Sequence, residues 1–289
     1  MTRALVLGGG GPVGVAWEVG LLAGLVEVGV DLTDADQIVG TSAGSIVGAR
    51  IALGEAPADS LEQGAAQIGD AAGTDASVVD AEALLAIGMA MFESWTGTRS
   101  SQEVIAQLGR MSAEATTVDE DSFVELVSAG TLGDEWPDRD YRCTAIDIET
   151  GEFVAWSAAS GVPLDRAVAS SCAVPGIFPP VTIDGRRYMD GGVQSGTNAQ
   201  LVAGADTVVI VSVISGLVPP MAELLRTTLD EEVDALRAGG AAVEVIEFDQ
   251  PTVELVAGNL MAFDNSHAVG AAGMAQAAAE AERIGAVWG

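Results

Sequence analysis

The chain has 289 residues, of which 49% are hydrophobic, so it can form one large α/β domain or two small ones and is not predominantly disordered. Its 42 acidic residues outnumber 12 basic ones, all of them arginine, and give a formal net charge of −30. Such a charge repels nucleic acids and anionic headgroups, so we expect no nucleic-acid partner and at most transient membrane contact. Either a GC-rich genome or adaptation to high salt explains the composition.

The N-terminal region is apolar, but it does not have the pattern of a leader peptide. Its apolar run is interrupted by glycines, Pro12 and Glu18, and it has no convincing cleavage site. No uninterrupted apolar stretch reaches the roughly 18 residues that suggest a spanning helix. We therefore expect a cytoplasmic protein. The two cysteines, Cys143 and Cys172, belong to no CxxC or Cys/His cluster, so we expect two buried thiols and no metal site.

The first fifty residues alternate between apolar strands and helices. We predict strands over 4–7 and 36–39, a helix from Pro12 to about Val28, and a helix from about Ala43. Four glycines separate the first strand from its helix, and proline is favoured at a first helical position. This order predicts parallel strands joined by crossover helices.

The rest of the chain continues this mixture of helices and strands. Residues 55–136 have a helical pattern, and apolar strands and two hairpins return after them. We predict helices over 81–92, 102–111, 219–237 and 266–284, and strands over 141–148, 153–156, 181–183, 187–189, 207–213 and 243–248. With no internal repeat and no linker, residues 1–289 are predicted to form a single domain with a helical insertion at about 55–136.

A Gly-x-Ser-x-Gly motif follows the second predicted strand. Gly40 and Gly44 flank Ser42, and a helix is expected directly afterwards. In this context a serine lies on a strained turn, with its hydroxyl clear of the sheet and next to the positive end of a helix. The alternative is a small-residue turn in which Ser42 merely caps the helix.

The glycine loop after the first strand has two interpretations. Gly8–Gly11 offers unhindered backbone N–H groups that can hold an oxyanion near Ser42. The same loop also fits Gly-x-Gly-x-x-Gly, which is the fingerprint of a dinucleotide site. That alternative requires a carboxylate at the end of the second strand, and none is present after Val39. Pro12 is also a poor fit to a helix that begins at a pyrophosphate.

A nucleophilic serine needs a base, and the chain contains one histidine, His267. His267 precedes the last predicted helix, where a polar residue at a helix terminus is an ordinary feature. The better candidate is Asp190, which follows an apolar strand and precedes two glycines. An aspartate has a reference pKa of about 3.9, so it is a weak base unless burial raises its pKa. A plain Asp-Gly-Gly turn is the alternative.

Three motifs in this order resemble the patatin-like phospholipase family: GGGGPVG at 8–14, GTSAG at 40–44 and DGG at 190–192. The stretch that leads into each of the last two motifs is also similar. The resemblance covers 4–54 and about 141–215 well and is thin over 55–136 and after 216. It implies a three-layer α/β/α fold with a central, mostly parallel sheet.

The resemblance also implies a Ser-Asp dyad without histidine, metal or cofactor. Asp190 would take the proton, Ser42 would attack an ester carbonyl to form an acyl-enzyme, and Gly9, Gly10 and Gly11 would hold the oxyanion. The substrate would be a lipid or a small acyl ester. The supporting motif glycines would be Gly14, Gly40, Gly44, Gly191 and Gly192.

One departure from the family is Val13, which stands where the family usually has arginine or lysine. The absence of this cation favours uncharged esters, such as neutral lipids, lysolipids or short-chain esters. It also leaves open a catalytically idle acyl-binding or regulatory protein. Asn198 is expected to support the loop after Asp190. No oligomeric state follows from the sequence.

Overall fold

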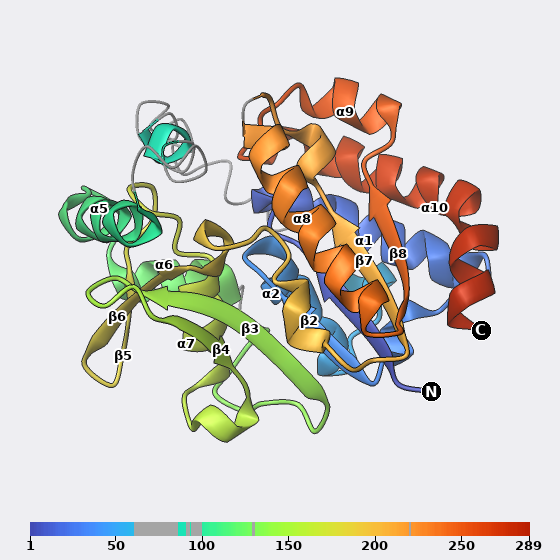
Figure 1. The fold of residues 1–289 in the computed structure, drawn as a ribbon, viewed down its shortest axis with the longest axis horizontal. Coiled ribbons are helices and arrows are strands. Elements are labelled where there is room, and N and C mark those ends of the chain that lie inside the picture. Colours follow the sequence, from blue (N-terminus) through green and yellow to red (C-terminus); the bar gives the residue numbers. More distant parts are fainter. Residues whose placement is uncertain (61–85, 91–92, 94–99, 129–130, 220) are drawn as a thin grey trace.

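A computed structural model describes residues 1–60, 86–90, 93, 100–128, 131–219 and 221–289 (Figure 1). The helices are α1 (Gly11–Glu27), α2 (Ala43–Ala52), α5 (Ser101–Glu114), α6 (Glu120–Ser128), α7 (Leu164–Ser171), α8 (Met221–Ala238), α9 (Gln250–Val256) and α10 (Ser266–Trp288). The strands are β1 (Arg3–Leu7), β2 (Gln37–Gly40), β3 (Asp140–Asp147), β4 (Phe153–Trp156), β5 (Val181–Ile183), β6 (Arg186–Asp190), β7 (Thr207–Ser212) and β8 (Ala242–Glu247).

Every predicted strand is present within about a residue at each end. The long predicted helices are also present, but α5 and α10 extend beyond the predicted residues 111 and 284 to Glu114 and Trp288. The sequence patterns missed three short helices, α6, α7 and α9, which are too short for a clear helical period. Most of the helix predicted over 81–92 lies outside the described residues. None of the helices that the structure describes is long and apolar enough to cross a bilayer.

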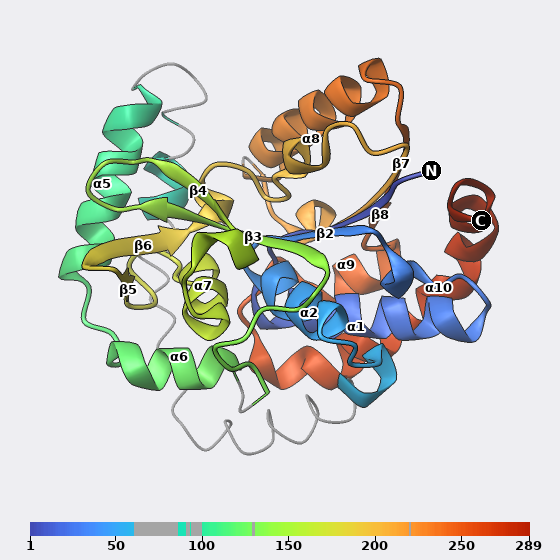
Figure 2. The ribbon, with the colours of Figure 1, turned by 90° about the horizontal axis from the view of Figure 1, so that it is seen from below.

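The eight strands form one mixed sheet in the order β5-β6-β3-β2-β1-β7-β8, and β4 also pairs with β3. Strands β3, β2, β1, β7 and β8 are mutually parallel, whereas β4, β5 and β6 are antiparallel to their neighbours. Helices cover both faces, as Figure 2 shows: α1, α2, α7, α9 and α10 lie on one side, α5 and α8 on the other. The predicted three-layer fold with a mostly parallel sheet is confirmed.

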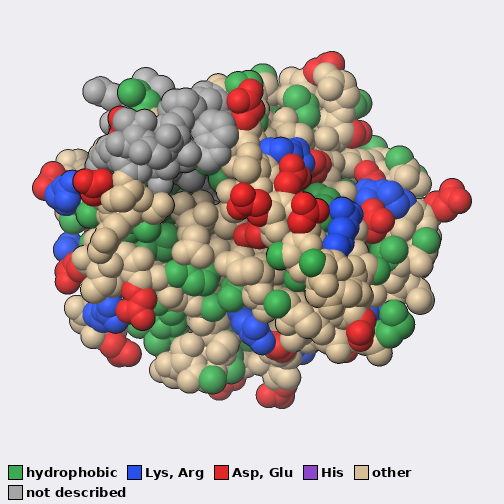
Figure 3. All heavy atoms as spheres, in the orientation of Figure 1, with side chains coloured by type: hydrophobic (Ala, Val, Ile, Leu, Met, Phe, Trp, Pro, Cys, Tyr) green, Lys and Arg blue, Asp and Glu red, His purple; other side chains and the backbone are tan. Residues whose placement is uncertain are grey.

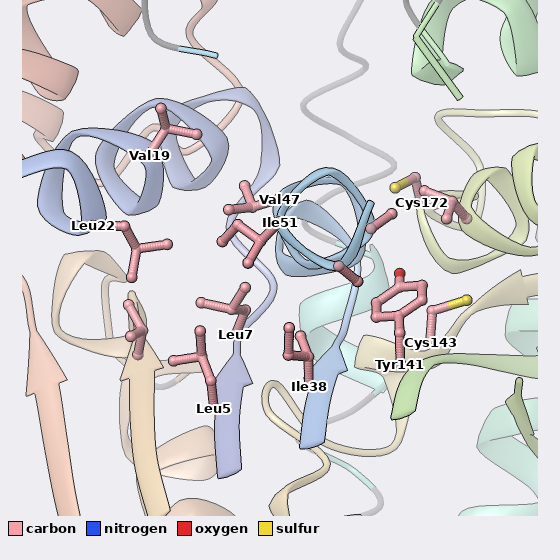
Figure 4. Packing of buried hydrophobic residues seen from close by; sticks show 14 of the residues in the cluster. Leu5, Leu7, Val19, Leu22, Ile38, Val47, Ile51, Tyr141, Cys143 and Cys172 are labelled. Atoms are coloured by element: carbon pink, nitrogen blue, oxygen red, sulfur yellow. The ribbon is translucent and has the colours of Figure 1, made fainter. Parts of the chain in front are cut away.

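Successive side chains of β1 point alternately to the two faces of the sheet. Leu5 and Leu7 point toward α1 and α2, while Ala4 and Val6 point toward α8. Figure 4 shows the first of these layers, in which Leu5 and Leu7 face the apolar side chains of α1 and α2. Because both faces of the parallel part of the sheet are buried, consecutive residues of a strand can all be apolar, as Ala4–Leu7 of β1 show.

The described helices between α2 and β3 pack against the same sheet. Val104 and Leu108 of α5 bury themselves against Ile146 of β3, and Phe123 of α6 stacks on Phe178 with ring centroids 4.8 Å apart. These contacts join α5 and α6 to the main core. Residues 61–85, which belong to the predicted helical insertion, lie outside the described residues.

Candidate active site

Ser42 lies at the sharp turn between β2 and α2. Its backbone has φ 52° and ψ −119°, a conformation that non-glycine residues rarely adopt and that is typical of functional strain. The flanking glycines make the turn possible. A Cβ on Gly40 would lie 2.3 Å from the Gly44 carbonyl oxygen, and one on Gly44 would lie 2.2 Å from that of Leu7. The strand-turn-helix context predicted for Ser42 is therefore present.

Strand β3 brings Asp190 to Ser42. In the sheet, Gly40 at the end of β2 pairs with Cys143, and Asp190 at the end of β6 pairs with Ala145. Strand β4 pairs with both of these β3 residues, and a strand has two edges, so β2 and β6 share the other edge. Because β2 is parallel and β6 antiparallel to β3, their carboxyl ends approach each other head to head.

The Ser42 hydroxyl faces the Asp190 carboxylate closely enough for a side-chain hydrogen bond that lowers the pKa of this carboxylate. Both residues are buried, with 8% and 4% of their surfaces exposed. Burial raises the pKa of Asp190 to about 7, against the lowering effect of the bonds from Ser42 and from the Gly192 N–H. The Gly192 N–H lies 2.7 Å from Asp190 Oδ1 and orients the carboxylate. A group with a pKa near neutrality is suited to both accepting and returning a proton.

The chain's histidine takes no part in this arrangement. His267 is exposed in the first turn of α10, and no hydrogen bond connects it to Ser42 or Asp190. Of the two candidate bases, Asp190 and His267, only the Asp190 carboxylate faces the serine hydroxyl.

Three backbone N–H groups near Ser42 have no hydrogen-bond partner within the described chain: those of Gly10, Gly11 and Ala43. Gly10 and Gly11 begin α1, and Ala43 begins α2, so each donor lies at the positive end of a helix. The N–H of Gly9, in contrast, donates to the Gly196 carbonyl at 2.8 Å. The sequence analysis included Gly9 as a donor and overlooked Ala43, although the residue after a motif serine is a recognisable position.

The other motif glycines allow close packing around the dyad. A Cβ on Gly9 would lie 3.2 Å from the Ser42 Cβ, and one on Gly14 would lie 3.2 Å from that of Ala43. A Cβ on Gly191 would lie 2.3 Å from Thr144 Oγ1, and one on Gly192 would lie 2.9 Å from Asp190 Oδ1. These glycines let the loop at 8–11 and the loop at 190–192 approach the side chains of Ser42 and Asp190.

A polar cluster supports the two strand ends on the α8 side of the sheet. The Asn198 side-chain amide donates to Thr41 Oγ1 at 3.0 Å and to the Ser195 carbonyl at 2.9 Å. It also reaches Thr144 Oγ1 and the Gly191 carbonyl, each at 3.4 Å. Asn198 is fully buried and has a left-handed backbone with φ 53°. It therefore joins the residue before Ser42 to the residue after Asp190.

The segment after α7 contacts the dyad from the opposite side. Ser171 Oγ accepts a hydrogen bond from the Ser42 N–H at 3.0 Å, and the Cys172 thiol donates to the Ser42 carbonyl at 3.3 Å. The Asp190 N–H donates to the Ala173 carbonyl at 3.0 Å. No local pattern in the sequence marks Ser171, because its partner Ser42 lies more than a hundred positions away.

Two residues of α1, Val13 and Glu18, are fully buried. Val13 is fully buried in the main core, so the position where the family usually has a cation lies inside an apolar layer. Glu18 is also fully buried, and neither of its carboxylate oxygens has a hydrogen-bond partner. Burial raises the pKa of Glu18 well above its usual value, against a smaller lowering effect of the Gly8 backbone.

Both cysteines are free thiols in the core. Burial raises the pKa of Cys143 to about 12 and also raises the pKa of Cys172, so both remain protonated. The part of the chain that the structure describes contains no group of three or more histidine, cysteine or acidic side chains arranged to hold a metal ion.

The chain is similar in sequence to known proteins. Uncharacterized NTE family proteins of Mycobacterium bovis and Mycobacterium tuberculosis are 26% identical to the chain over 213 residues, which is 72% of this chain and 48% of theirs. The chain thus spans about half the length of the curated relatives it matches.

Two solved structures are similar over 98% of the chain at 13% identity. VipD from Legionella pneumophila is covered to 67% with a TM-score of 0.48, and the type III effector ExoU to 53% with a TM-score of 0.43. Scores at this level carry no argument about activity.

The family model described as patatin-like phospholipase matches residues 5–203, a range that contains the glycine loop, Ser42, Asp190 and Asn198. Since the match extends over more than half of the sequence, the chain belongs to the patatin-like phospholipase family.

Proposed function

We propose that the chain is a serine hydrolase that cleaves acyl esters of lipids through a Ser42–Asp190 dyad. The observation that carries this proposal is the Ser42 hydroxyl bonded to a buried carboxylate whose pKa is about 7. The lipid nature of the substrate rests on the family. Because the chain spans about half of its curated relatives, nothing is inferred from what those longer proteins do.

The proposed reaction has two stages. Asp190 accepts the Ser42 proton as the Ser42 oxygen attacks the ester carbonyl, and the proton then passes to the leaving alcohol as the acyl-enzyme forms. In the second stage Asp190 takes a proton from water, which attacks the acyl-enzyme, and the proton returns to Ser42 as the fatty acid leaves. General base catalysis of this kind contributes roughly 10²–10⁴-fold to a rate.

The proposed oxyanion donors are the unpaired N–H groups of Gly10, Gly11 and Ala43. They belong to the N-terminal ends of two helices, where the helix dipole favours negative charge. Loss of one such donor typically costs about 10²–10³-fold in rate. Gly9 contributes by its lack of a side chain beside Ser42 rather than through its N–H, which is already bonded to Gly196.

The proposed substrates are uncharged or zwitterionic esters. Val13 places an apolar side chain where a cation would stand, and the groups that shift the pKa of Asp190 are burial, Ser42 and Gly192, without a positive charge. Among the described groups that shift the pKa of Asp190 there is no cation, so an anionic headgroup gains no charge partner from them. Neutral lipids, lysolipids and short-chain esters fit this chemistry.

The test replaces each dyad side chain with one of similar size that cannot act as nucleophile or base. We expect Ser42→Ala and Asp190→Asn each to lower kcat for a p-nitrophenyl acyl ester by at least about 10³-fold, because nucleophile and base act as a unit. His267→Ala is the matched control and should keep the wild-type rate. A near-normal rate in either dyad variant would rule the dyad out, and a large loss in His267→Ala would indicate a histidine base.

The second candidate function is an idle acyl-binding protein, and the apolar environment of Val13 is the observation that favours it. A fluorophosphonate probe separates the two candidates, because it reacts covalently with an activated serine. Labelling at Ser42 that disappears in Asp190→Asn supports the hydrolase. Absence of labelling in the folded wild-type protein supports the binding protein.

A further inference from the structure

We propose that Ser171 is a positioning residue for the nucleophile, and that Ser171–Ala173, which we name the dyad clamp, sets the relative placement of Ser42 and Asp190. This inference deepens the proposed function and rests on it. The clamp is three consecutive residues at the end of α7, and each of them contacts the backbone of a dyad member.

The contacts divide between the two dyad residues. Ser171 Oγ accepts from the Ser42 N–H at 3.0 Å, and the Cys172 thiol donates to the Ser42 carbonyl at 3.3 Å. The next residue, Ala173, accepts from the Asp190 N–H at 3.0 Å. Because the three residues are consecutive, they link the Ser42 backbone to the Asp190 backbone and restrict the separation between the two.

The Ser42 peptide needs such support. Its backbone is strained at φ 52°, and as the residue preceding α2 it has no intrahelical acceptor for its N–H. Ser171 Oγ is the acceptor that the structure supplies, and it is fully buried. The hydrogen bond therefore fixes the peptide plane on which the direction of the Ser42 side chain depends.

The expected effect on the reaction follows from geometry. A misplacement of about 1 Å between reacting groups costs up to about 10²-fold in rate, and ester binding does not involve Ser171. Ser171→Ala should therefore lower kcat by about 10–100-fold with KM changed less than about threefold. A change in kcat alone is what distinguishes positioning from loss of substrate binding.

Ser170 provides the matched control one residue earlier. It is equally buried, and its hydroxyl accepts from Trp156 Nε1 at 3.0 Å and donates to the Ala167 carbonyl at 2.7 Å, but it contacts neither dyad residue. Ser170→Ala and Ser171→Ala each remove one buried acceptor, so we expect similar shifts in the urea midpoint. Only Ser171→Ala should lower kcat.

Hydrogen exchange gives a readout that does not depend on activity. We expect the Ser42 amide to exchange faster in Ser171→Ala than in wild type and to be unchanged in Ser170→Ala. If Ser171→Ala fails to fold, Ser171→Cys replaces it, because sulfur is a weak acceptor of similar size and should give an intermediate loss of protection.

The outcomes separate this inference from the proposed function. If the Ser42 amide exchanges faster in Ser171→Ala but neither the wild type nor any variant hydrolyses esters, the clamp is supported and the hydrolase is overturned. If the wild type is active and Ser171→Ala has the same kcat, the clamp is overturned and the hydrolase stands. The same conclusion follows if Ser170→Ala and Ser171→Ala lose kcat equally.

Discussion

At the residue scale, the same carboxylate chemistry gives different properties in different surroundings. Asp147 is also buried, yet its pKa is lowered, because N–H bonds from Thr150 and Glu149, the Thr150 hydroxyl and the Arg186 charge outweigh desolvation. Asp190 is more deeply buried and has fewer such partners, so burial dominates and its pKa rises to about 7. Only the second environment gives a carboxylate that can exchange a proton near neutrality.

This difference predicts a pH profile with one limb. If Asp190 is the base, its ionised form is the active one, so kcat/KM for an uncharged ester should rise about tenfold per pH unit below about pH 7 and level off above it. The measurement is initial rate against pH from about 5 to 9, corrected for spontaneous hydrolysis. His267→Ala should give the same profile. A flat profile through pH 7 would contradict the assignment of the base.

At the element scale, close helix packing holds the oxyanion loop in place. Helix α1 carries that loop at its first turn and packs along α10, where glycines from both helices meet. A Cβ on Gly20 would lie 2.0 Å from the Gly270 carbonyl oxygen, and one on Gly273 would lie 2.5 Å from that of Trp17. Contact between the two backbones is therefore possible because these positions lack side chains.

We predict that Gly20→Ala lowers the free energy of unfolding by at least about 1–3 kcal/mol, because the added methyl group meets backbone atoms and forces the helices apart. Urea unfolding measures the change. Gly285→Ala is the control on α10, since its Cβ would meet only a Val30 methyl at 3.4 Å. There, the higher helix propensity of alanine should make the change neutral or stabilising, by up to about 1 kcal/mol. Equal stability of Gly20→Ala and wild type would contradict the packing argument.

At the scale of the whole molecule, the net charge of −30 determines the long-range field. Seven arginines form ion pairs within the described chain: Arg3, Arg142, Arg166, Arg186, Arg187, Arg226 and Arg283. On the face shown in Figure 3, arginines lie among acidic side chains rather than in a continuous basic area. The protein therefore repels anionic surfaces at a distance. The face shown in Figure 3 has no continuous basic patch that would compensate for this repulsion.

We predict slower hydrolysis of lipids in anionic vesicles than in zwitterionic ones, with the difference shrinking as salt is raised, because salt screens charges beyond about 10 Å at 0.1 M. The measurement is fatty-acid release from phosphatidylglycerol and phosphatidylcholine vesicles at two salt concentrations. A water-soluble short-chain ester controls for a general effect of salt on the enzyme. Faster hydrolysis in anionic vesicles at low salt would contradict the prediction.

The sequence by itself determined the strands, the two glycine motifs, Ser42 and Asp190 as candidates, and the family. These features are local: alternation of apolar residues, helix-starting glycines and a serine between strand and helix depend on neighbours within a few positions. The strands around Ser42 were predicted almost residue for residue, and the short helices α6, α7 and α9 were missed because two turns contain too little period to recognise.

Only the tertiary structure decided how the site is assembled. Strand β3 joins the ends of β2 and β6, which places residue 190 against residue 42, and burial then sets the pKa of that aspartate. The pairing of the Gly9 N–H with Gly196, the freedom of the Ala43 N–H and the contact of Ser171 with Ser42 likewise depend on segments far apart in the chain. Desolvation and long-range hydrogen bonds arise from the packed whole, so no local pattern in the sequence can specify them.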